Sequence, residues 1–260
     1  MTAGIYVHIP FCRQRCRYCT FYSTTGRIPD WRSYLKALEK HLDVLNREGS
    51  QPLPIDTVYF GGGTPSVMDP SFFAHTLTTL GRRLNLASPL EITVEVNPES
   101  VDESYLSELQ ASGVNRLSIG AQSFEPTVLK RIGRCHSIQE TRSVVRWATQ
   151  RFGNVSVDLM IGVTGSTMTM EKLLPSDVLN QVQHVSVYML EGERSHPLQA
   201  DPDRTADQYL SLCEYLEIHD FCQYEISNFS RPGFHSRHNC HYWNGDTYLG
   251  LGPGAHSFIN

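Results

Sequence analysis

The chain has 260 residues, of which 40% are apolar and 19% charged, and its formal net charge is -5. This length can bury a full hydrophobic core, and the composition excludes wholesale disorder. The negative charge argues against a protein whose main role is to grip phosphate backbones, and no apolar run reaches the ~18 residues of a membrane span.

Strands and helices are predicted to alternate along the chain, because short β-branched or aromatic runs are separated by longer helical patterns. The predicted strands are Ile5–Ile9, Thr57–Phe60, Glu91–Val96, Arg116–Ile119, Val155–Met160 and His184–Leu190. The predicted helices are Trp31–Arg47, Ser71–Leu84, Glu103–Ala111, Ile138–Gln150, Met170–Val182 and Ala206–Ile218. Asp102 and Ser137 are expected to be helix N-caps, and Gly113 is expected to end a helix.

This alternation predicts an α/β fold with a parallel sheet, either a partial TIM-like (β/α)6 barrel or an open doubly wound sheet. The polar residues at the predicted strand ends favour the barrel, because its strand ends all feed one rim. These residues are His8, Gly61–Thr64, Asn97, Gln122, Asp158 and Glu191. Residues 1–222 are the predicted barrel core, and residues 223–260, which show no helical periodicity, are a predicted irregular extension packed on it.

Seven cysteines are present, and three of them, Cys12, Cys16 and Cys19, fall within eight residues directly after the first predicted strand. An odd, clustered set is not typical of a secreted disulfide scaffold, and the N-terminus lacks the features of a secretory signal. We therefore expect a reducing, cytoplasmic location. Soft thiolates at this spacing favour an iron–sulfur cluster, and three ligands would leave one iron of a cubane open. The alternative is a structural zinc site completed by His8 or a distant cysteine.

The C-x3-C-x2-C spacing resembles the signature of the radical S-adenosylmethionine (SAM) superfamily. YVHIPFCRQRCRYCTF, FGGGTPS, EVNPES, IGAQSF, GRCHS, VDLMIG and GPGAHSF are similar, in the same order, to blocks of its HemW and coproporphyrinogen dehydrogenase group. The resemblance implies a [4Fe–4S] cluster on the three cysteines, SAM on the open iron, and reductive cleavage of SAM to a 5′-deoxyadenosyl radical. It also implies the SAM-binding residues Tyr6, Gly62, Gly63, Thr64, Glu95, Gln122, Arg134 and Asp158.

Two functions within this group are weighed. The coproporphyrinogen III oxidases carry a further cysteine where this chain has Phe21, and they have a longer segment before the cluster. HemW-like haem chaperones carry an H-N-x-x-Y-W block, which is present here from His238 to Trp243. A neutral imidazole is a standard haem ligand, so His238 is a candidate for binding haem or for building the haem site. The sequence therefore favours a chaperone that binds haem or a porphyrin, receives electrons from a donor and passes haem to an acceptor protein.

Three departures and two wider alternatives accompany this interpretation. GVTGST replaces the usual GLPGQT, Thr20 stands where an aspartate is usual, and the C-terminal helical domain of the group is expected to be absent. The first wider alternative is an RNA-modifying radical SAM enzyme, which would carry a basic RNA-binding module; the sequence shows no such module, and we predict no nucleic-acid partner. The second is a non-catalytic binding module on a barrel scaffold, which would not bind SAM.

Overall fold

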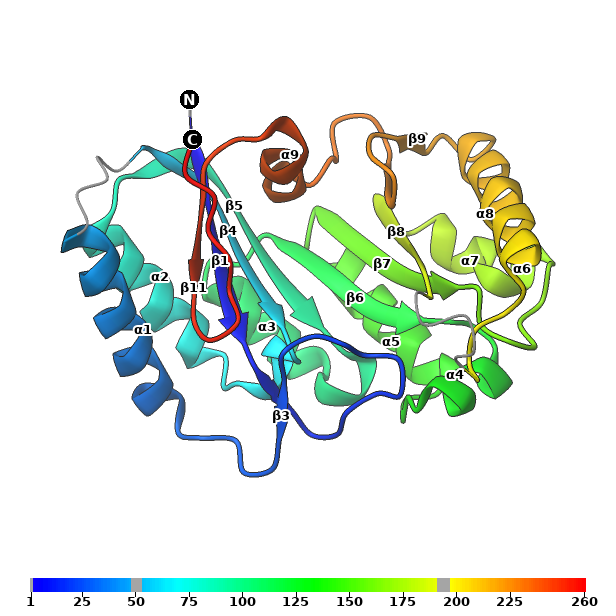
Figure 1. The fold of residues 1–260 in the computed structure, drawn as a ribbon, viewed down its shortest axis with the longest axis horizontal. Helices are drawn as coiled ribbons and strands as arrows, with labels where there is room; N and C mark the ends of the chain where they lie inside the picture. Colours follow the sequence, from blue (N-terminus) through cyan, green and yellow to red (C-terminus); the bar gives the residue numbers. More distant parts are fainter. Residues whose placement is uncertain (1, 48–52, 191–196) are drawn as a thin grey trace.

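Nine strands form one sheet in the part of the protein that the computed structural model describes, residues 2–47, 53–190 and 197–260. Their order is β11-β1-β4-β5-β6-β7-β8-β10-β9 (Figure 1). The strands are β1 (Ala3–Ile9), β4 (Ile55–Gly62), β5 (Leu86–Val96), β6 (Arg116–Gln122), β7 (Asn154–Ile161), β8 (His184–Met189), β9 (Cys222–Gln223), β10 (Asn228–Ser230) and β11 (Tyr248–Leu251). The six central strands from β1 to β8 are parallel and follow chain order, which confirms the predicted partial (β/α)6 barrel.

Helices connect the parallel strands and cover the outer face of the sheet (Figure 1). The helices are α1 (Trp31–Arg47), α2 (Ser71–Arg83), α3 (Glu103–Ala111), α4 (Pro126–Ile132), α5 (Ile138–Thr149), α6 (Met170–Leu173), α7 (Ser176–Leu179), α8 (Pro202–Glu217) and α9 (Arg237–Asn244), with the 3-10 turns η1 (Pro65–Val67) and η2 (Pro98–Ser100). The predicted N-caps are confirmed: Asp102 accepts a hydrogen bond from the Tyr105 amide, and Ser137 forms a capping box with Glu140. Gly113 follows α3 with a φ of 94°, as expected for a glycine that ends a helix.

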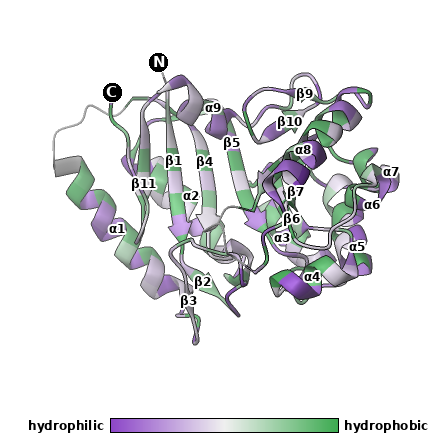
Figure 2. Cartoon of the chain, turned by 45° about the vertical axis from the view of Figure 1, so that its right-hand side comes forward, coloured by the Kyte–Doolittle hydropathy of each residue, from purple (hydrophilic) through white to green (hydrophobic). Residues whose placement is uncertain are grey.

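Alternation along the strands separates an apolar outer face from a polar inner face. In β1, Ile5, Val7 and Ile9 are fully buried in the core between the sheet and its helices. Tyr6 and His8 point to the other side. Figure 2 shows hydrophobic and hydrophilic segments alternating along α1, which packs one face on this core. The inner face is therefore free to carry polar chemistry.

The predicted helix Met170–Val182 is wrong, because the structure breaks it into α6 and α7. Pro175 lies between them with an extended backbone, and a proline cannot supply the amide hydrogen that a continuous helix needs at that position. The Ser176 amide instead donates to the Glu171 carboxylate. Helix α4 was not predicted, and α8 begins four residues before the expected Ala206.

Residues 223–260, called here the tail, contain more regular secondary structure than the sequence indicates. β11 pairs in parallel with β1, β10 pairs antiparallel with β8, and α9 covers the H-N-x-x-Y-W block. Ser236 caps α9, and Gly245 ends it with a φ of 69°. Its two buried side chains are His238 and His241, so hydrophobic periodicity could not reveal this helix. Figure 1 shows α9 near the end of the sheet where the strands begin.

Candidate functional site

The three clustered cysteines lie on the segment that follows β1, called here the cysteine loop. Cys12 ends the short strand β2 (Phe11–Cys12), which pairs with β3 (Thr24–Thr25), and Cys16 and Cys19 lie between these two strands. All three are free thiols; Cys12 is buried, and Cys16 and Cys19 are half-buried. Burial raises the pKa of Cys19, and its neighbours Cys16 and Cys12 raise it further. The three thiol groups are therefore close enough for the charge of one to influence the ionisation of another.

His8, the possible fourth ligand of a zinc site, is already hydrogen-bonded through both ring nitrogens. Its Nδ1 lies 3.2 Å from the Tyr6 hydroxyl, and its Nε2 lies 2.8 Å from the Tyr22 carbonyl oxygen. Within the described residues, no set of three or more His, Cys, Asp or Glu side chains is placed to hold a single metal ion. His8 thus ties β1 to the cysteine loop rather than offering a free nitrogen.

The glycines at the end of β4 pack closely against β1 and against the segment that carries Cys12. A Cβ on Gly62, whose φ is 115°, would lie 2.7 Å from the His8 ring, and a Cβ on Gly63 would lie 2.9 Å from the Cys12 sulfur. The amides of Gly63 and Thr64 donate to the carbonyl oxygens of Ile9 and Phe11 at 2.8 and 2.9 Å. Only glycine permits this approach, so the glycine motif fixes the height of the cysteine loop above the sheet.

A chain of hydrogen bonds joins two of the cysteines through Thr64 and Asn97, which follow β4 and β5, and Arg134, which follows α4. Thr64 Oγ1 donates to Cys12 Sγ at 3.5 Å and accepts from Asn97 Nδ2 at 3.2 Å. Arg134 Nη2 donates to Asn97 Oδ1 at 2.8 Å, and its Nη1 lies 3.8 Å from Cys16 Sγ. Sulfur ligands with hydrogen-bond donors and a positive charge beside them are the donor set that an iron–sulfur cluster uses. The residues present therefore fit such a cluster.

Glu99 and His136 complete the surroundings of Arg134, and the sequence did not single them out as site residues. Glu99 Oε2 accepts from Arg134 Nη2 at 3.3 Å and lies 3.0 Å from His136 Nδ1. Burial alone would raise the pKa of Glu99, but the His136 hydrogen bond and the Arg134 charge bring it below its ordinary value. Glu99 lies in the EVNPES block and His136 in the GRCHS block, and this location within the family blocks was the feature of the sequence that could have identified them as site residues.

Two carboxylates, Glu95 and Asp158, project into the inner face of the barrel. Glu95 accepts from the Tyr59 hydroxyl at 3.0 Å and from the Gly62 amide at 3.2 Å. Asp158 accepts from Ser118 Oγ at 2.8 and 3.0 Å. Burial raises the pKa of Asp158 and, together with the nearby Asp158 charge, raises that of Glu95 to about 7. A cationic ligand between them would relieve this repulsion.

Gln122 ends β6 next to these groups. Its backbone has a φ of 63°, which is unusual for a residue other than glycine. Sparsely populated backbone conformations of this kind cluster at ligand sites. The structure thus places Gln122 at the same edge of the sheet as Asn97, which is consistent with the common rim predicted for the strand ends. Glu191, at the last predicted strand end, lies outside the described residues.

A cavity of about 630 Å³ opens between the cysteine loop, the inner face and the tail. Its lining consists of Tyr6, His8, Thr20, Phe21, Tyr22, Tyr59, Gly62, Glu95, His238, Asn239, Tyr242, Tyr248, Gly254 and His256. Six of these fourteen residues are phenylalanine or tyrosine, which gives the cavity flat apolar walls. The volume is that of a typical small-molecule or cofactor site.

His238 forms part of this cavity but is almost sealed, with 1% of its surface exposed. Its Nδ1 lies 2.7 Å from Thr57 Oγ1, and its Nε2 lies 2.8 Å from the Tyr242 hydroxyl. Its ring stacks on Tyr59 at 5.1 Å and on Tyr6 at 6.4 Å. Burial lowers its pKa to about 3, so the ring is neutral.

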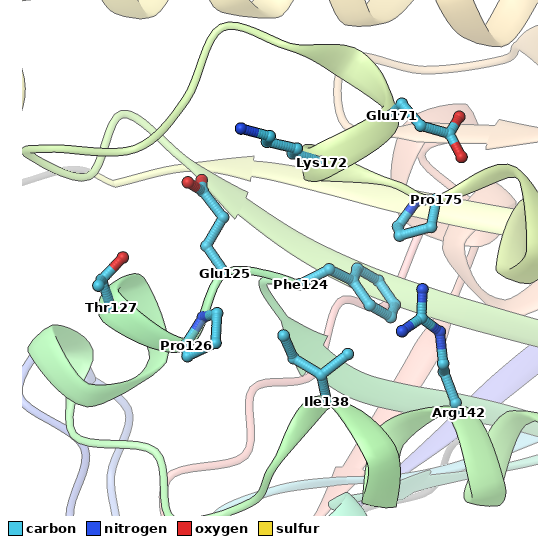
Figure 3. A pocket seen from close by; sticks show the side chains of 9 residues that line it. All are labelled: Phe124, Glu125, Pro126, Thr127, Ile138, Arg142, Glu171, Lys172 and Pro175. Carbon is cyan, nitrogen blue, oxygen red and sulfur yellow. The ribbon is translucent and has the colours of Figure 1, made fainter.

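A smaller cavity of about 320 Å³ lies on the helical side of the fold, between α4, α5 and α6 (Figure 3). None of the predicted site residues lines it. Three of its four charged side chains are held by protein partners: Arg142 pairs with Asp177, Glu125 accepts from the Thr167 amide, and Glu171 accepts from Ser176. This cavity is therefore separate from the cysteine loop, none of whose residues lines it.

Comparison with known proteins decides the family, because the sequence profile of the Radical SAM superfamily matches residues 6–174. The chain belongs to the radical SAM superfamily. It is 38% identical over 266 residues to a Danio rerio protein named Radical S-adenosyl methionine domain-containing protein 1, mitochondrial, covering 98% of this chain and 60% of that protein. It is 34% identical over 267 residues to the Heme chaperone HemW of Bacillus subtilis, covering 98% of this chain and 70% of that protein.

The solved structure of coproporphyrinogen III oxidase (HemN) from Escherichia coli has the same fold as this radical SAM chain. It superimposes with a TM-score of 0.83 at 22% identity, covering 99% of this chain and 65% of that one. The chain spans 60% of the length of the Danio rerio relative. Superfamily membership implies a [4Fe–4S] cluster and SAM, and the relatives establish this as a HemW-like radical SAM protein. No described helix is long and apolar enough to cross a membrane.

The raised pKa of Glu95 predicts a pH dependence of stability in the cofactor-free protein. The unfolded chain releases this proton near 4.5 and the folded chain near 7, so the free energy of unfolding should fall as the pH rises between those values. Glu95→Gln carries no charge and should reduce the fall by an amount on the order of 2 kcal/mol. Urea unfolding at pH 5 and pH 8 measures this difference. Exposed Glu108→Gln is the control, and an unchanged fall in Glu95→Gln would contradict the assignment.

Proposed function

We propose that this radical SAM protein is a haem chaperone, which binds haem in the aromatic cavity and passes it to a haem-requiring protein. The main support is that the cavity of about 630 Å³ adjoins the cysteine loop in a chain similar to proteins named Heme chaperone HemW. Haem is a flat, largely apolar macrocycle, and Tyr22, Tyr242 and Tyr248, which line the cavity and lie outside the proposed SAM set, offer flat apolar surface. An electron donor and a haem-accepting protein are the proposed partners. Cytoplasmic location and the lack of a nucleic-acid partner stay predictions.

Cys12, Cys16 and Cys19 are the proposed ligands of the [4Fe–4S] cluster, which when bound supplies the electron for reductive cleavage of SAM. The proposed SAM contacts are Tyr6, Gly62, Gly63, Thr64, Glu95, Gln122, Arg134 and Asp158. Two features support this set. The glycine backbone approaches the cysteine loop without side chains, and two carboxylates face a region that a sulfonium and an ammonium group would neutralise.

His238 is proposed to build the haem cavity. Its ring is packed between tyrosines and holds the Tyr242 hydroxyl at 2.8 Å, so it fixes one aromatic wall in place. Each ring nitrogen of His238 makes one hydrogen bond, so binding of the haem iron by either nitrogen would require the hydrogen bond at that nitrogen to break. Its proposed role is therefore to position Tyr242.

An anaerobic assay that contains SAM, a reductant and haem tests the proposal. We expect haem to bind with a change in its Soret band and to transfer to an acceptor apo-protein, while coproporphyrinogen III is not consumed. Formation of protoporphyrinogen would show instead an oxygen-independent coproporphyrinogen III oxidase, the function named for the Escherichia coli structure. Absence of haem binding in the intact, iron-loaded protein would remove the chaperone function.

A further inference from the structure

We propose that His256, in the turn that follows β11, supplies the imidazole that binds the haem iron. The proposal rests on the proposed function, because it assigns a residue to the same cavity. Three histidines line the cavity: His8, His238 and His256. Their ring nitrogens are not equally free, and this difference selects one of them.

The ring nitrogens of His8 and His238 are occupied by hydrogen bonds within the protein. Both are buried, with 5% and 1% of their surfaces exposed, and each has hydrogen-bond partners at both ring nitrogens. His256 is exposed, and among the described residues its ring has no hydrogen bond or ion pair. An iron ligand needs an accessible lone pair on a neutral ring nitrogen, and only His256 offers one without rearrangement.

The turn that carries His256 is held firmly although its side chains are exposed. Tyr248 and Phe258 exchange two backbone hydrogen bonds of 2.8 and 2.9 Å, and the Gly250 amide donates to Ser257 Oγ at 2.9 Å. The strand and the returning chain are so close that a Cβ on Gly250 would lie 2.2 Å from the His256 carbonyl oxygen. The His256 backbone is therefore fixed beside the cavity, which is what a ligand-bearing position requires.

The same turn is packed against β1 and the cysteine loop. A Cβ on Gly254 would lie 2.9 Å from the Cβ of Tyr22, and a Cβ on Gly252 would lie 2.7 Å from the His8 carbonyl oxygen. Tyr22 and Phe21 are 60% and 67% exposed, so this edge of the cavity presents aromatic surface to solvent. Both aromatic side chains line the cavity together with His256, so aromatic surface and the free imidazole face the same space.

Ferric haem titrated into the full, iron-loaded chain provides the test, read by Soret absorption and electron paramagnetic resonance. We expect wild type to show an imidazole-ligated spectrum. His256→Ala should lose that signature and bind haem about tenfold more weakly. Added free imidazole should restore the signature, and His256→Cys should convert it to a thiolate type. His75→Ala, an exposed histidine on α2, is the matched control and should behave as wild type.

Two outcomes overturn parts of this scheme separately. If wild type binds haem and His256→Ala shows the same spectrum, then the assignment of His256 is wrong while the haem proposal stands. If wild type binds no haem at all, then the haem proposal itself fails. His238→Ala distinguishes the two histidines further: loss of the imidazole signature in that variant, with His256→Ala unchanged, would make His238 the ligand.

Discussion

Cys16→Ala should retain far fewer than the about four irons and about four sulfides per chain expected of the anaerobically reconstituted protein. A cubane with only two protein thiolates loses an anchoring ligand as well as the geometry that leaves a single iron open. Binding of SAM should be lost with the cluster, because the sulfonium ligand then has no iron to approach. Iron and sulfide analysis, followed by equilibrium binding of SAM, measures both effects.

Cys135→Ala is the matched control for this experiment, because Cys135 is an exposed free thiol outside the clustered set. It should load iron and bind SAM as wild type does. Equal iron loading in the Cys16 and Cys135 variants would contradict a cluster on the loop after β1. Recovery of one zinc per wild-type chain would instead support the structural zinc alternative.

Arg134→Ala should lower the free energy of unfolding by about 3 kcal/mol, even without the cluster. The Arg134 side chain is almost buried and donates to Asn97, to Glu99 and to the Gly120 carbonyl oxygen. Its removal takes this donor from Asn97 Oδ1 and from the Gly120 carbonyl oxygen, and it leaves Glu99 with His136 as its side-chain partner, in a place that water reaches poorly. Urea unfolding of the apo-protein measures the loss, and Arg134→Lys should lose less because one ammonium group can serve part of the set.

Arg151→Ala serves as the control for an ordinary ion pair. Arg151 pairs with Glu103 at 2.7 Å, but the Glu103 side chain is 53% exposed, so its loss should cost about 1 kcal/mol or less. If Arg134→Ala costs no more than Arg151→Ala, then Arg134 does not organise the loop between the strand ends. A large loss of stability together with loss of iron would support its role beside Cys16.

Local patterns in the sequence predict much of this fold. The strands carry strict alternation, such as Ile5, Val7 and Ile9 on the buried face, and alternation is a property of neighbouring residues. The polar strand ends could be located for the same reason, since the ends follow from the strands. Asp158 and Glu95 could be placed on the inner face by counting residues from the apolar ones.

The remainder depends on contacts between residues far apart in the sequence. His238 is fixed by Thr57, 181 positions away, and no local pattern indicates that pairing. Arg134 meets Asn97 across 37 positions, so the hydrogen-bond chain between two cysteines could be seen only in three dimensions. Helix α9 buries histidines instead of aliphatic residues, and hydrophobic periodicity is blind to that choice. Long-range polar contacts therefore account for most of what the sequence did not reveal.

The parallel pairing of β11 with β1 has a consequence for the order of assembly. β1 receives its second neighbour only when residues 248–251 are in place, so the first strand of the barrel is completed after all the other parallel strands of the barrel have been made. The metal-binding loop leaves that strand directly. Until residues 248–251 have paired, one edge of β1 has unpaired backbone groups close to the three cysteine thiols. In this period the chain is most exposed to wrong strand pairing and to oxidation of these thiols.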